Sequence, residues 1–279
     1  MQQNFTAIFD NKNTVVRAPG FSAALSLDCG QAFRWKEDEN GFWHGVAFGR
    51  PLTLCEKDGG ITLFNVDEAE FEAVWKNYFD LERDYESLKA SYGEDEHLKK
   101  AIEFCGGIHI LNQEPWEALC SFIISQNNNI PRIKGIVERL CALLGDRLEN
   151  GDYAFPSPEK IVDAGVDGLA PIRSGFRAKY IYDAAVKVEN GEIDFEKIKA
   201  LPLCEAAEEL KKIKGVGDKV AACALLYGLG RADAFPVDVW VKRILEELYP
   251  GGMPSCAEGT RGIAQQYLFH WRRNNEVIL

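Results

Sequence analysis

The sequence contains no uninterrupted run of about 18 apolar residues, which excludes a helix that crosses a membrane. Its first ten residues, MQQNFTAIFD, contain no basic segment followed by an apolar stretch, so we expect no secretion signal. We expect a cytoplasmic protein, associated with the nucleoid in a prokaryote or located in the nucleus in a eukaryote. The eight cysteines form no CxxC pair, which argues against a zinc ribbon and against an iron–sulfur cluster. We therefore expect reduced thiols, no metal site and no required cofactor.

Positive charge is also scarce. The 32 Lys and Arg residues face 43 Asp and Glu residues, which gives a net charge of -11 and counts against nonspecific binding of polyanions. This balance does not exclude DNA binding, because turn amides and helix N-termini can hold phosphates without any lysine. A local basic patch is present at Lys211, Lys212, Lys214 and Lys219.

The first 65 residues or so are rich in β-branched and aromatic residues, broken by Gly, Pro, Asn and Asp. The segment Asp58-Gly59-Gly60 joins two of the resulting strand candidates and predicts a hairpin. We expect an antiparallel sheet that packs one face on helices. Its strands are predicted at 14–18, 23–27, 31–35, 42–48, 52–57 and 61–66.

From Asp67 onward the apolar spacing becomes helical. We predict an α+β protein: a twisted antiparallel sheet domain with flanking helices over 1–100, of the kind seen in TATA-binding protein, packed on a mostly helical region over 101–279. The boundary is expected near 90–105. Helices are predicted at 67–79, 116–125, 133–144, 178–188, 205–213, 219–229 and 239–248, with a further helix at the C-terminus.

A short turn, Gly215-Val216-Gly217, lies between two of these helices and forms a helix-hairpin-helix at about 203–229. Glycines allow a ligand to approach the backbone closely, and the amides of the turn and of the next helix start suit a phosphate. A GxG turn alone is more often a plain corner between helices.

Lys219 opens the second helix of this hairpin, and Asp238 follows nineteen positions later, after Pro236. A neutral lysine amine is a nucleophile that can form a Schiff base. Asp238 is a candidate N-cap, and a carboxylate at a helix start can also stabilise positive charge. The alternatives are a solvated or phosphate-contacting Lys219 and an Asp238 that only caps its helix. Cys223 lies four residues after Lys219, on the same helix face, where a core cysteine is equally expected.

Six segments together resemble the helix-hairpin-helix base-excision DNA glycosylases, and among them the 8-oxoguanine DNA glycosylases of the eukaryotic type. The resemblance extends from the sheet near Gly30 to the C-terminal helix. Three positions depart from the family pattern: Ala32 replaces a serine, Phe176 a tyrosine, and Trp240 a histidine that contacts phosphate. The segments are CGQAFRW at 29–35, QNNNIPR at 126–132, GFRAKY at 175–180, GVGDK at 215–219, PVDV at 236–239 and AQQYLF at 264–269.

The resemblance implies a role for each of these segments. In the base pocket, the Gly30 carbonyl would accept a hydrogen bond from the lesion, Gln265 would bind its pairing edge, and Phe269 and Cys223 would lie on its two faces. Around the vacated space, Asn127 would fill the gap, Phe176 would act as a wedge, and the cytosine left behind would be contacted by Arg132 and Arg177. The backbone of Gly215, Val216 and Gly217 would bind DNA phosphate.

The resemblance further implies a monomeric, bifunctional DNA N-glycosylase and apurinic or apyrimidinic site lyase. Its partner would be double-stranded DNA that contains 8-oxoguanine, preferably opposite cytosine. Lys219 would form a Schiff base with the sugar, Asp238 would stabilise the cationic sugar, and β-elimination would cut the strand. Hairpin carbonyls could hold a structural monovalent cation.

Two other interpretations remain open. An oxidised-pyrimidine glycosylase similar to endonuclease III would usually carry four clustered cysteines after the catalytic aspartate, whereas only Cys256 follows Asp238 here. A non-catalytic helix-hairpin-helix DNA-binding protein would have no use for the pair of Lys219 and Asp238.

Overall fold

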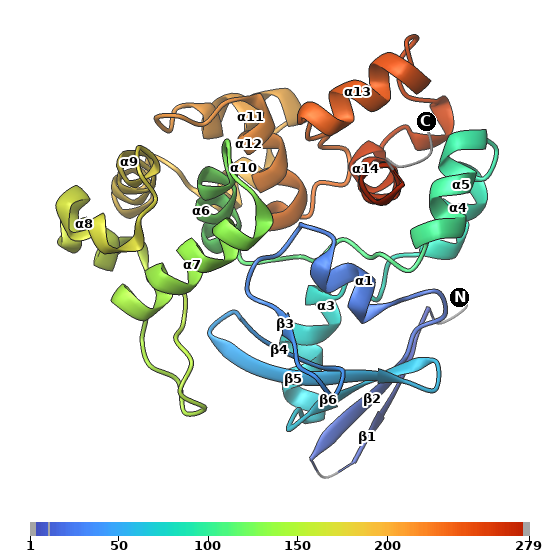
Figure 1. The fold of residues 1–279 in the computed structure, drawn as a ribbon, viewed down its shortest axis with the longest axis horizontal. Coiled ribbons are helices and arrows are strands. Elements are labelled where there is room, and N and C mark those ends of the chain that lie inside the picture. Colours follow the sequence, from blue (N-terminus) through green and yellow to red (C-terminus); the bar gives the residue numbers. More distant parts are fainter. Residues whose placement is uncertain (1–3, 11, 276–279) are drawn as a thin grey trace.

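The computed structural model describes residues 4–10 and 12–275. A six-stranded antiparallel sheet forms one end of the molecule and helices form the rest (Figure 1). The strand order is β1-β2-β6-β5-β4-β3. The strands are β1 (Thr6–Phe9), β2 (Asn13–Arg17), β3 (Lys36–Glu37), β4 (Phe42–Ala47), β5 (Arg50–Lys57) and β6 (Gly60–Phe64).

The predicted hairpin joins β5 to β6, with Lys57 opposite Gly60. Asp58 and Gly59 both adopt positive φ, at 54° and 72°. A two-residue turn with positive φ at both positions matches the twist of the flanking strands, which explains the Asp-Gly pair. The hairpin prediction is therefore confirmed.

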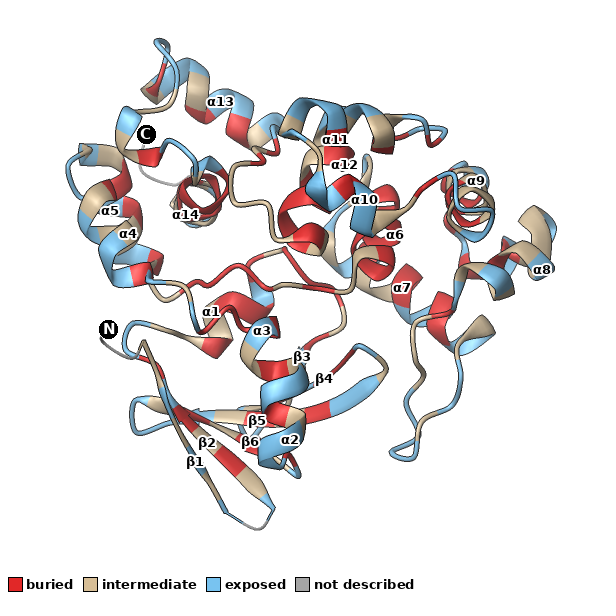
Figure 2. Ribbon diagram, turned by 180° about the vertical axis from the view of Figure 1, so that it is seen from behind, coloured by how far each residue is buried: buried red, intermediate tan, exposed pale blue. Residues whose placement is uncertain are grey.

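One face of the sheet is covered by a continuous helical run made of α2 (Glu68–Glu70), η1 (Phe71–Trp75) and α3 (Lys76–Tyr78) (Figure 2). Buried and less buried residues alternate along β2 and β6, as expected for strands with one covered face. Trp75 of the helical run and Phe79, the residue that follows it, share an apolar core with Leu54 and Leu63 of the sheet. The predicted sheet with helices on one face is confirmed.

Two of the predicted strands are wrong. Residues 23–27 lie in a helix, α1 (Ala23–Asp28), because Ser22 caps its N-terminus and Ala and Leu favour helix. Residues 31–35 form no strand, since the Gln31 side chain is tied to other segments and Trp35 packs directly over Gly45 of β4. Any side chain at position 45 would collide with the Trp35 ring, so β4 accommodates this crossing segment only with glycine.

The helical region confirms the predicted helices and adds several that the sequence pattern did not reveal. None of the described helices is long and apolar enough to cross a membrane. The helices are α4 (Tyr85–Tyr92), α5 (Glu96–Cys105), α6 (Pro115–Ser125), α7 (Ile130–Leu144), α8 (Pro158–Gly168), η2 (Ala170–Ile172), α9 (Arg177–Glu189), α10 (Phe195–Ala200), α11 (Leu203–Lys211), α12 (Asp218–Cys223), η3 (Ala224–Gly228), α13 (Val239–Leu248), η4 (Ser255–Ala257) and α14 (Arg261–Asn274).

The predicted boundary near 90–105 falls on α4 and α5, and it stays a prediction. Tyr85 and Tyr92 of α4 belong to the apolar core of the helical region, and α5 packs against α14. Cys29 and Phe33 also belong to that core, although they follow the sheet-side helix α1. The segment between α1 and β3 is thus held between the two cores.

Candidate active site

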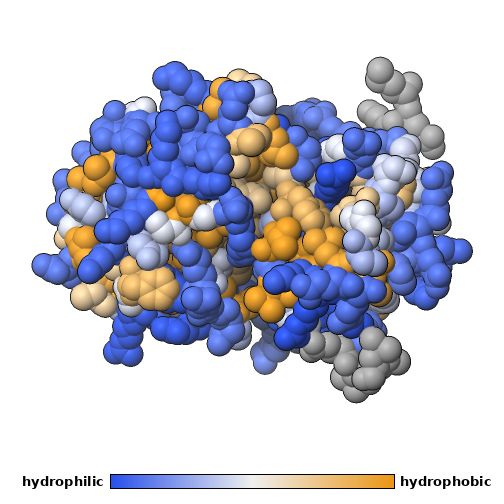
Figure 3. Space-filling view, turned by 90° about the horizontal axis from the view of Figure 1, so that it is seen from above, coloured by the Kyte–Doolittle hydropathy of each residue, from blue (hydrophilic) through white to orange (hydrophobic). Residues whose placement is uncertain are grey.

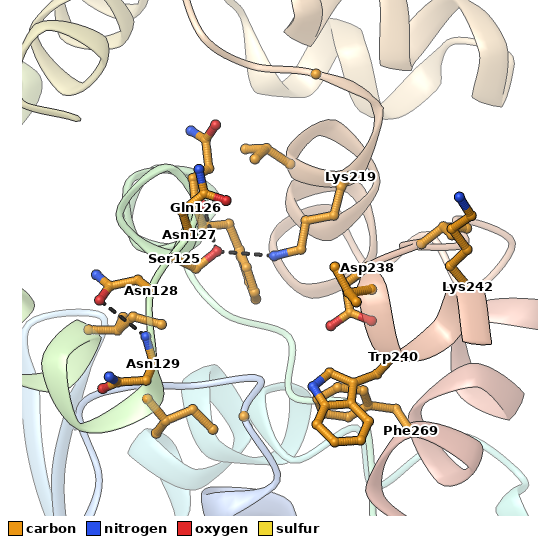
Figure 4. Close-up of a pocket in the computed structure, with 18 of the residues that line it drawn as sticks. Ser125, Gln126, Asn127, Asn128, Asn129, Lys219, Asp238, Trp240, Lys242 and Phe269 are labelled. Carbon is orange, nitrogen blue, oxygen red and sulfur yellow. Dashed lines mark hydrogen bonds between the residues drawn. The ribbon is translucent and has the colours of Figure 1, made fainter. Parts of the chain in front are cut away.

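A cavity of about 840 Å³ opens in the helical region, and segments far apart in the sequence form its walls. Seen from above, apolar side chains gather in a hollow between hydrophilic rims (Figure 3). The residues that line it come from the segment after α1, the end of α6, the start of α7, the starts of α12 and α13, and α14 (Figure 4). They are Gly30, Phe33, Phe122, Ser125, Gln126, Asn127, Asn128, Asn129, Ile130, Ile133, Gly217, Asp218, Lys219, Val220, Val237, Asp238, Val239, Trp240, Lys242, Phe269 and Arg273.

Lys219 lies in the first turn of α12 and points into the cavity toward the end of α6 (Figure 4). Its Nζ atom donates a hydrogen bond to Ser125 Oγ at 3.0 Å and lies 5.2 Å from the centre of the Phe122 ring. Ser125 Oγ in turn donates to the Phe122 carbonyl at 2.8 Å. The amine is therefore held at the cavity wall by one hydroxyl and one aromatic face.

Asp238 caps α13, as predicted. Its Oδ1 atom accepts a hydrogen bond from the Val241 amide at 2.8 Å, and its backbone is extended. The cap fixes the carboxylate at the rim that also carries Lys219 (Figure 4). Capping and a role in the cavity are therefore compatible in one side chain.

The Cys223 thiol is buried next to these two charges. Burial raises the pKa of Cys223, while the Lys219 charge lowers the pKa and the Asp238 charge raises it, so both charges act on the same thiol. The side chain is only 2% exposed, and Cys223 is not among the residues that line the cavity. The resemblance implies a place for Cys223 against the base, and that role stays a prediction.

Gly30 and Phe269 form the opposite side of the cavity. Gly30 has φ +92°, and a Cβ atom there would lie 3.2 Å from Ile130 Cδ1 and 3.9 Å from the Phe269 ring. Glycine therefore leaves room between these two side chains. Gln265, one helical turn before Phe269, is 5% exposed, and its Oε1 atom has no hydrogen-bond partner among the described residues. Such a buried acceptor is costly unless something pairs with it.

The Asn127 loop is held from outside the cavity by Arg177. The Arg177 side chain donates from Nε to the Gln126 carbonyl at 2.8 Å and from Nη2 to the Asn127 carbonyl at 2.9 Å. Asn127 has φ 47°, a conformation that asparagine tolerates better than most residues. The contact of Arg177 with the cytosine, which the resemblance implies, stays a prediction, and here its guanidinium supports the loop.

Arg132, which the resemblance assigns to the cytosine, and Phe176, which it assigns as the wedge, do not line the cavity. Arg132 lies in the first turn of α7, where its amide donates to the capping Asn129 side chain at 3.0 Å. Phe176 precedes α9 and is 49% exposed, with the Arg177 guanidinium 4.5 Å from its ring centre. Burial, and to a smaller extent the Arg132 charge, lower the pKa of Arg177.

The hairpin between α11 and α12 contains one left-handed glycine, not two. Gly215 has φ +79°, and a Cβ atom there would lie within 2.3 Å of the Tyr180 ring. The Val216 amide closes the turn on the Ile213 carbonyl at 3.0 Å. Gly217, the N-cap of α12, has φ -108° and open space where a Cβ would lie, so it supplies no side chain to cap the first turn. Neither backbone strain nor a neighbouring atom requires glycine at position 217.

Several residues of the cavity, among them Phe122, Ser125, Lys242 and Arg273, were not predicted from the sequence, whereas Trp240 was noted there as a departure from the family pattern. Phe122 and Ser125 precede the asparagine run, and a polar residue at the end of an apolar helix was the available signal. Trp240 lies beside Phe269 (Figure 4). The Arg243 guanidinium lies over the Trp240 ring, 5.6 Å from the ring centre. Lys242 and Arg273 add positive charge to the rim. Within residues 4–10 and 12–275, no group of three or more His, Cys, Asp or Glu side chains has a metal-binding arrangement.

Comparison with known families divides the chain into two matched parts. Residues 15–119 match the family model of the 8-oxoguanine DNA glycosylase N-terminal domain, and residues 120–255 match the HhH-GPD superfamily of base excision DNA repair proteins. A probable N-glycosylase/DNA lyase of Methanothermobacter thermautotrophicus is 31% identical over 233 residues, which cover 72% of this chain and 74% of that protein.

The chain belongs to the 8-oxoguanine DNA glycosylase family. The N-glycosylase/DNA lyase of Saccharomyces cerevisiae is 38% identical over 158 residues, which cover 51% of this chain and 42% of the yeast protein. The chain therefore matches less than half of the length of that relative.

A solved structure is similar over nearly the whole length. It is the Clostridium acetobutylicum 8-oxoguanine glycosylase/lyase in complex with double-stranded DNA that contains cytosine opposite 8-oxoguanine. The two chains are 38% identical, with a TM-score of 0.91, and the match covers 98% of this chain and 99% of that chain. The family and fold-class predictions are confirmed, and the site assignments remain predictions.

Proposed function

We propose that this protein flips 8-oxoguanine out of duplex DNA, preferably opposite cytosine, excises it through an imine on Lys219 and then cuts the strand by β-elimination. Glycosylase and lyase activity fit its family and the activities for which its relatives are named. A base inside a duplex is out of reach of side chains, so the reaction requires an extruded nucleotide. The cavity of about 840 Å³ is large enough to receive one.

The observation that carries this proposal is the meeting of four elements at one cavity. Lys219 from α12, Asp238 from the start of α13, Phe269 from α14 and Gly30 from the segment after α1 line the same space. Phe269 offers an aromatic face to a base. Because position 30 is glycine, no side chain separates its backbone from the cavity. The buried Gln265 Oε1 lacks a partner among the described residues, and the edge of a purine could supply one.

The chemistry begins when the neutral Lys219 amine attacks C1′ of the extruded nucleotide. The bond from C1′ to the base nitrogen breaks, and the base leaves with the electron pair and takes up a proton. The Asp238 carboxylate stabilises the positive charge that develops on the sugar, which is a strong effect in a site that excludes water. Sugar ring opening then gives a protonated imine between Nζ and C1′, and O4′ takes a proton.

The imine acidifies the protons on C2′. Removal of one of them drives β-elimination, in which the bond from C3′ to its oxygen breaks and the 3′ phosphate leaves. Lys219 must shed a proton before it attacks, and its Nζ atom donates a hydrogen bond to Ser125 Oγ at 3.0 Å. We assign Ser125 the task of aiming the amine before DNA binds.

The outer residues would position the DNA. In this proposal Asn127 fills the vacated space, the exposed Phe176 ring wedges the duplex, and Arg132 meets the cytosine. The amides of the hairpin and of the first turn of α12, near Gly217, would bind a phosphate. We further propose a monomer located in the cytoplasm or nucleus, with a structural monovalent cation at the hairpin carbonyls.

Borohydride trapping tests the proposal. A duplex with one 8-oxoguanine opposite cytosine is incubated with protein and borohydride, beside duplexes with guanine or thymine glycol. Reduction of the imine leaves a covalent adduct, which we expect only with 8-oxoguanine. Lys219→Gln should form no adduct and should cut the strand more than 1,000-fold more slowly, because it lacks a nucleophile.

Each other outcome has a distinct meaning. An adduct with thymine glycol alone would assign the protein to pyrimidine lesions. Tight binding to the 8-oxoguanine duplex without any adduct would leave a binding protein or an enzyme that uses water. Normal strand cutting by Lys219→Gln would overturn the role of Lys219.

A further inference from the structure

The Gly30 peptide is held by a buried hydrogen-bond network that begins on the helix of the lysine. Tyr227 lies in η3, which continues α12 without a break in the chain. Its hydroxyl donates to Gln266 Oε1 at 2.6 Å, and Gln266 Nε2 donates to the Cys29 carbonyl at 3.3 Å. Two side-chain hydrogen bonds thus connect the helix that carries Lys219, through α14, to the residue before Gly30.

A second path leads from Tyr227 to the residue after Gly30. The Gln113 amide donates to the Tyr227 carbonyl at 2.8 Å, and Gln113 Nε2 donates to the Gln31 carbonyl at 2.7 Å. The carbonyls on both sides of Gly30 therefore accept hydrogen bonds from glutamines that are tied to one tyrosine.

Further contacts restrict the Gln31 side chain and the Tyr227 ring. Gln31 is fully buried, and its amide donates to the Ser26 and His109 carbonyls, at 2.8 Å each, and accepts from the Leu111 amide at 2.9 Å. Tyr227 stacks on Phe122 with ring centres 5.1 Å apart. Burial raises the pKa of Tyr227 well above its usual range, which keeps its hydroxyl a donor.

Phe122 also connects this network to the nucleophile. The Phe122 ring stacks on Tyr227, and its centre lies 5.2 Å from Lys219 Nζ. η3 (Ala224–Gly228), which follows the helix that carries Lys219, is a π-helical turn. Such turns are frequent at functional sites.

We propose that Tyr227 and Gln266 are positioning residues that set the Gly30 carbonyl relative to Lys219 and thereby determine recognition of the extruded base. This inference rests on the proposed function, since it assumes that Gly30 faces the base. The network joins the base-contacting segment to the nucleophile helix through buried groups alone, so a shift of either segment breaks its hydrogen bonds. Neither side chain touches the cavity, and both act through the backbone at Gly30.

Two activities of the same protein separate positioning from folding. Excision of 8-oxoguanine requires the base pocket, whereas β-elimination at a preformed abasic site requires only Lys219 and the sugar. We expect Tyr227→Phe to lower the single-turnover excision rate about 10-fold, because it leaves Gln266 Oε1 buried without a partner. The rate at an abasic site should stay within about twofold of wild type, since one removed hydroxyl leaves Phe122 stacking intact.

Matched variants complete the test. Gln266→Met should show the same split, because it removes both hydrogen bonds of the glutamine at similar volume. Tyr267→Phe is the control: its hydroxyl is also buried and donates to the Ile108 carbonyl at 3.1 Å, outside the network, so both rates should stay near wild type.

The outcomes are distinct. An excision rate within twofold of wild type in both Tyr227→Phe and Gln266→Met would overturn the positioning role. Equal loss of both rates would also overturn it, because that pattern indicates a general structural effect. A wild-type protein that cuts abasic sites without excising 8-oxoguanine would overturn the proposed function and this inference with it.

Discussion

At the scale of single residues, the candidate site combines structural and chemical demands in the same side chains. Asp238 accepts a backbone hydrogen bond at the start of α13 and also lines the cavity. Ser125 accepts from Lys219 while it closes a hydrogen bond within α6. Loss of activity in a variant is therefore informative only when its effect on folding is measured beside it.

Substitution of Asp238 separates its two roles. Asparagine is as good an N-cap as aspartate, so Asp238→Asn should keep the free energy of unfolding within about 0.5 kcal/mol of wild type. Excision should fall by roughly 100- to 1,000-fold, since the carboxylate charge no longer stabilises the sugar cation. Urea unfolding and single-turnover excision are the two measurements.

Asp238→Ala is the comparison for this pair. It loses the cap as well, which should destabilise the protein by about 1 kcal/mol. Near-normal excision by Asp238→Asn would mean that capping is the whole task of this residue.

At the scale of elements, the hairpin between α11 and α12 shows two glycines required for different reasons. Gly215 is left-handed and faces the Tyr180 ring, so a side chain is excluded by the fold. Gly217 has an ordinary φ and faces open space, so the fold tolerates a side chain there. The difference can be tested directly.

Gly217→Ala should fold with normal stability and bind DNA about 10-fold or more weakly, because the added methyl group keeps a phosphate away from the first-turn amides. Gly215→Ala should lose at least about 2 kcal/mol of stability, because a left-handed conformation and a collision with Tyr180 both oppose it. Thermal unfolding and binding to a duplex measure the two effects. Unchanged DNA affinity in Gly217→Ala would exclude the hairpin as a phosphate site.

At the scale of the whole molecule, the segment between α1 and β3 joins the sheet to the helical region. Arg34 of this segment pairs with Glu117 of α6 at 3.5 Å, and both side chains are only 10% exposed. Burial, partly offset by the Arg34 charge, raises the pKa of Glu117 to about 7 from its ordinary 4.5. This buried carboxyl should make the stability of the protein depend on pH.

The direction in which stability changes with pH follows from proton linkage. Between about pH 4.5 and 7 the folded protein keeps a proton on Glu117 that the unfolded chain releases. This contribution is fully present below pH 4.5 and is lost as the pH rises toward 7. The loss is on the order of 3 kcal/mol.

Glu117→Gln removes this titration. The free energy of unfolding of wild type minus that of the variant should therefore decrease between pH 4.5 and 7 and level off above pH 7. Urea unfolding at several pH values measures it. Parallel pH profiles for the two proteins would show that Glu117 does not titrate in this range.

Much of the architecture could be predicted from the sequence, since alternating and helical spacing of apolar residues is a local signal. The hairpin between β5 and β6, the helix-hairpin-helix and the Asp238 cap all follow from short segments. The strand expected at 23–27 was wrong although its signals are local, since Ser22 caps the helix through the nearby Leu25 amide. The strand expected at 31–35 was wrong because the burial of Gln31 and Trp35 depends on distant partners.

By itself, then, the sequence determined the fold class, the family and the pair of Lys219 and Asp238, because these reside in contiguous motifs. Only the tertiary structure decided which side chains share a space. It placed Ser125 against Lys219 and showed Arg177 supporting the Asn127 loop. Such contacts join residues 50 or more positions apart, and no local pattern encodes the packing that brings them together.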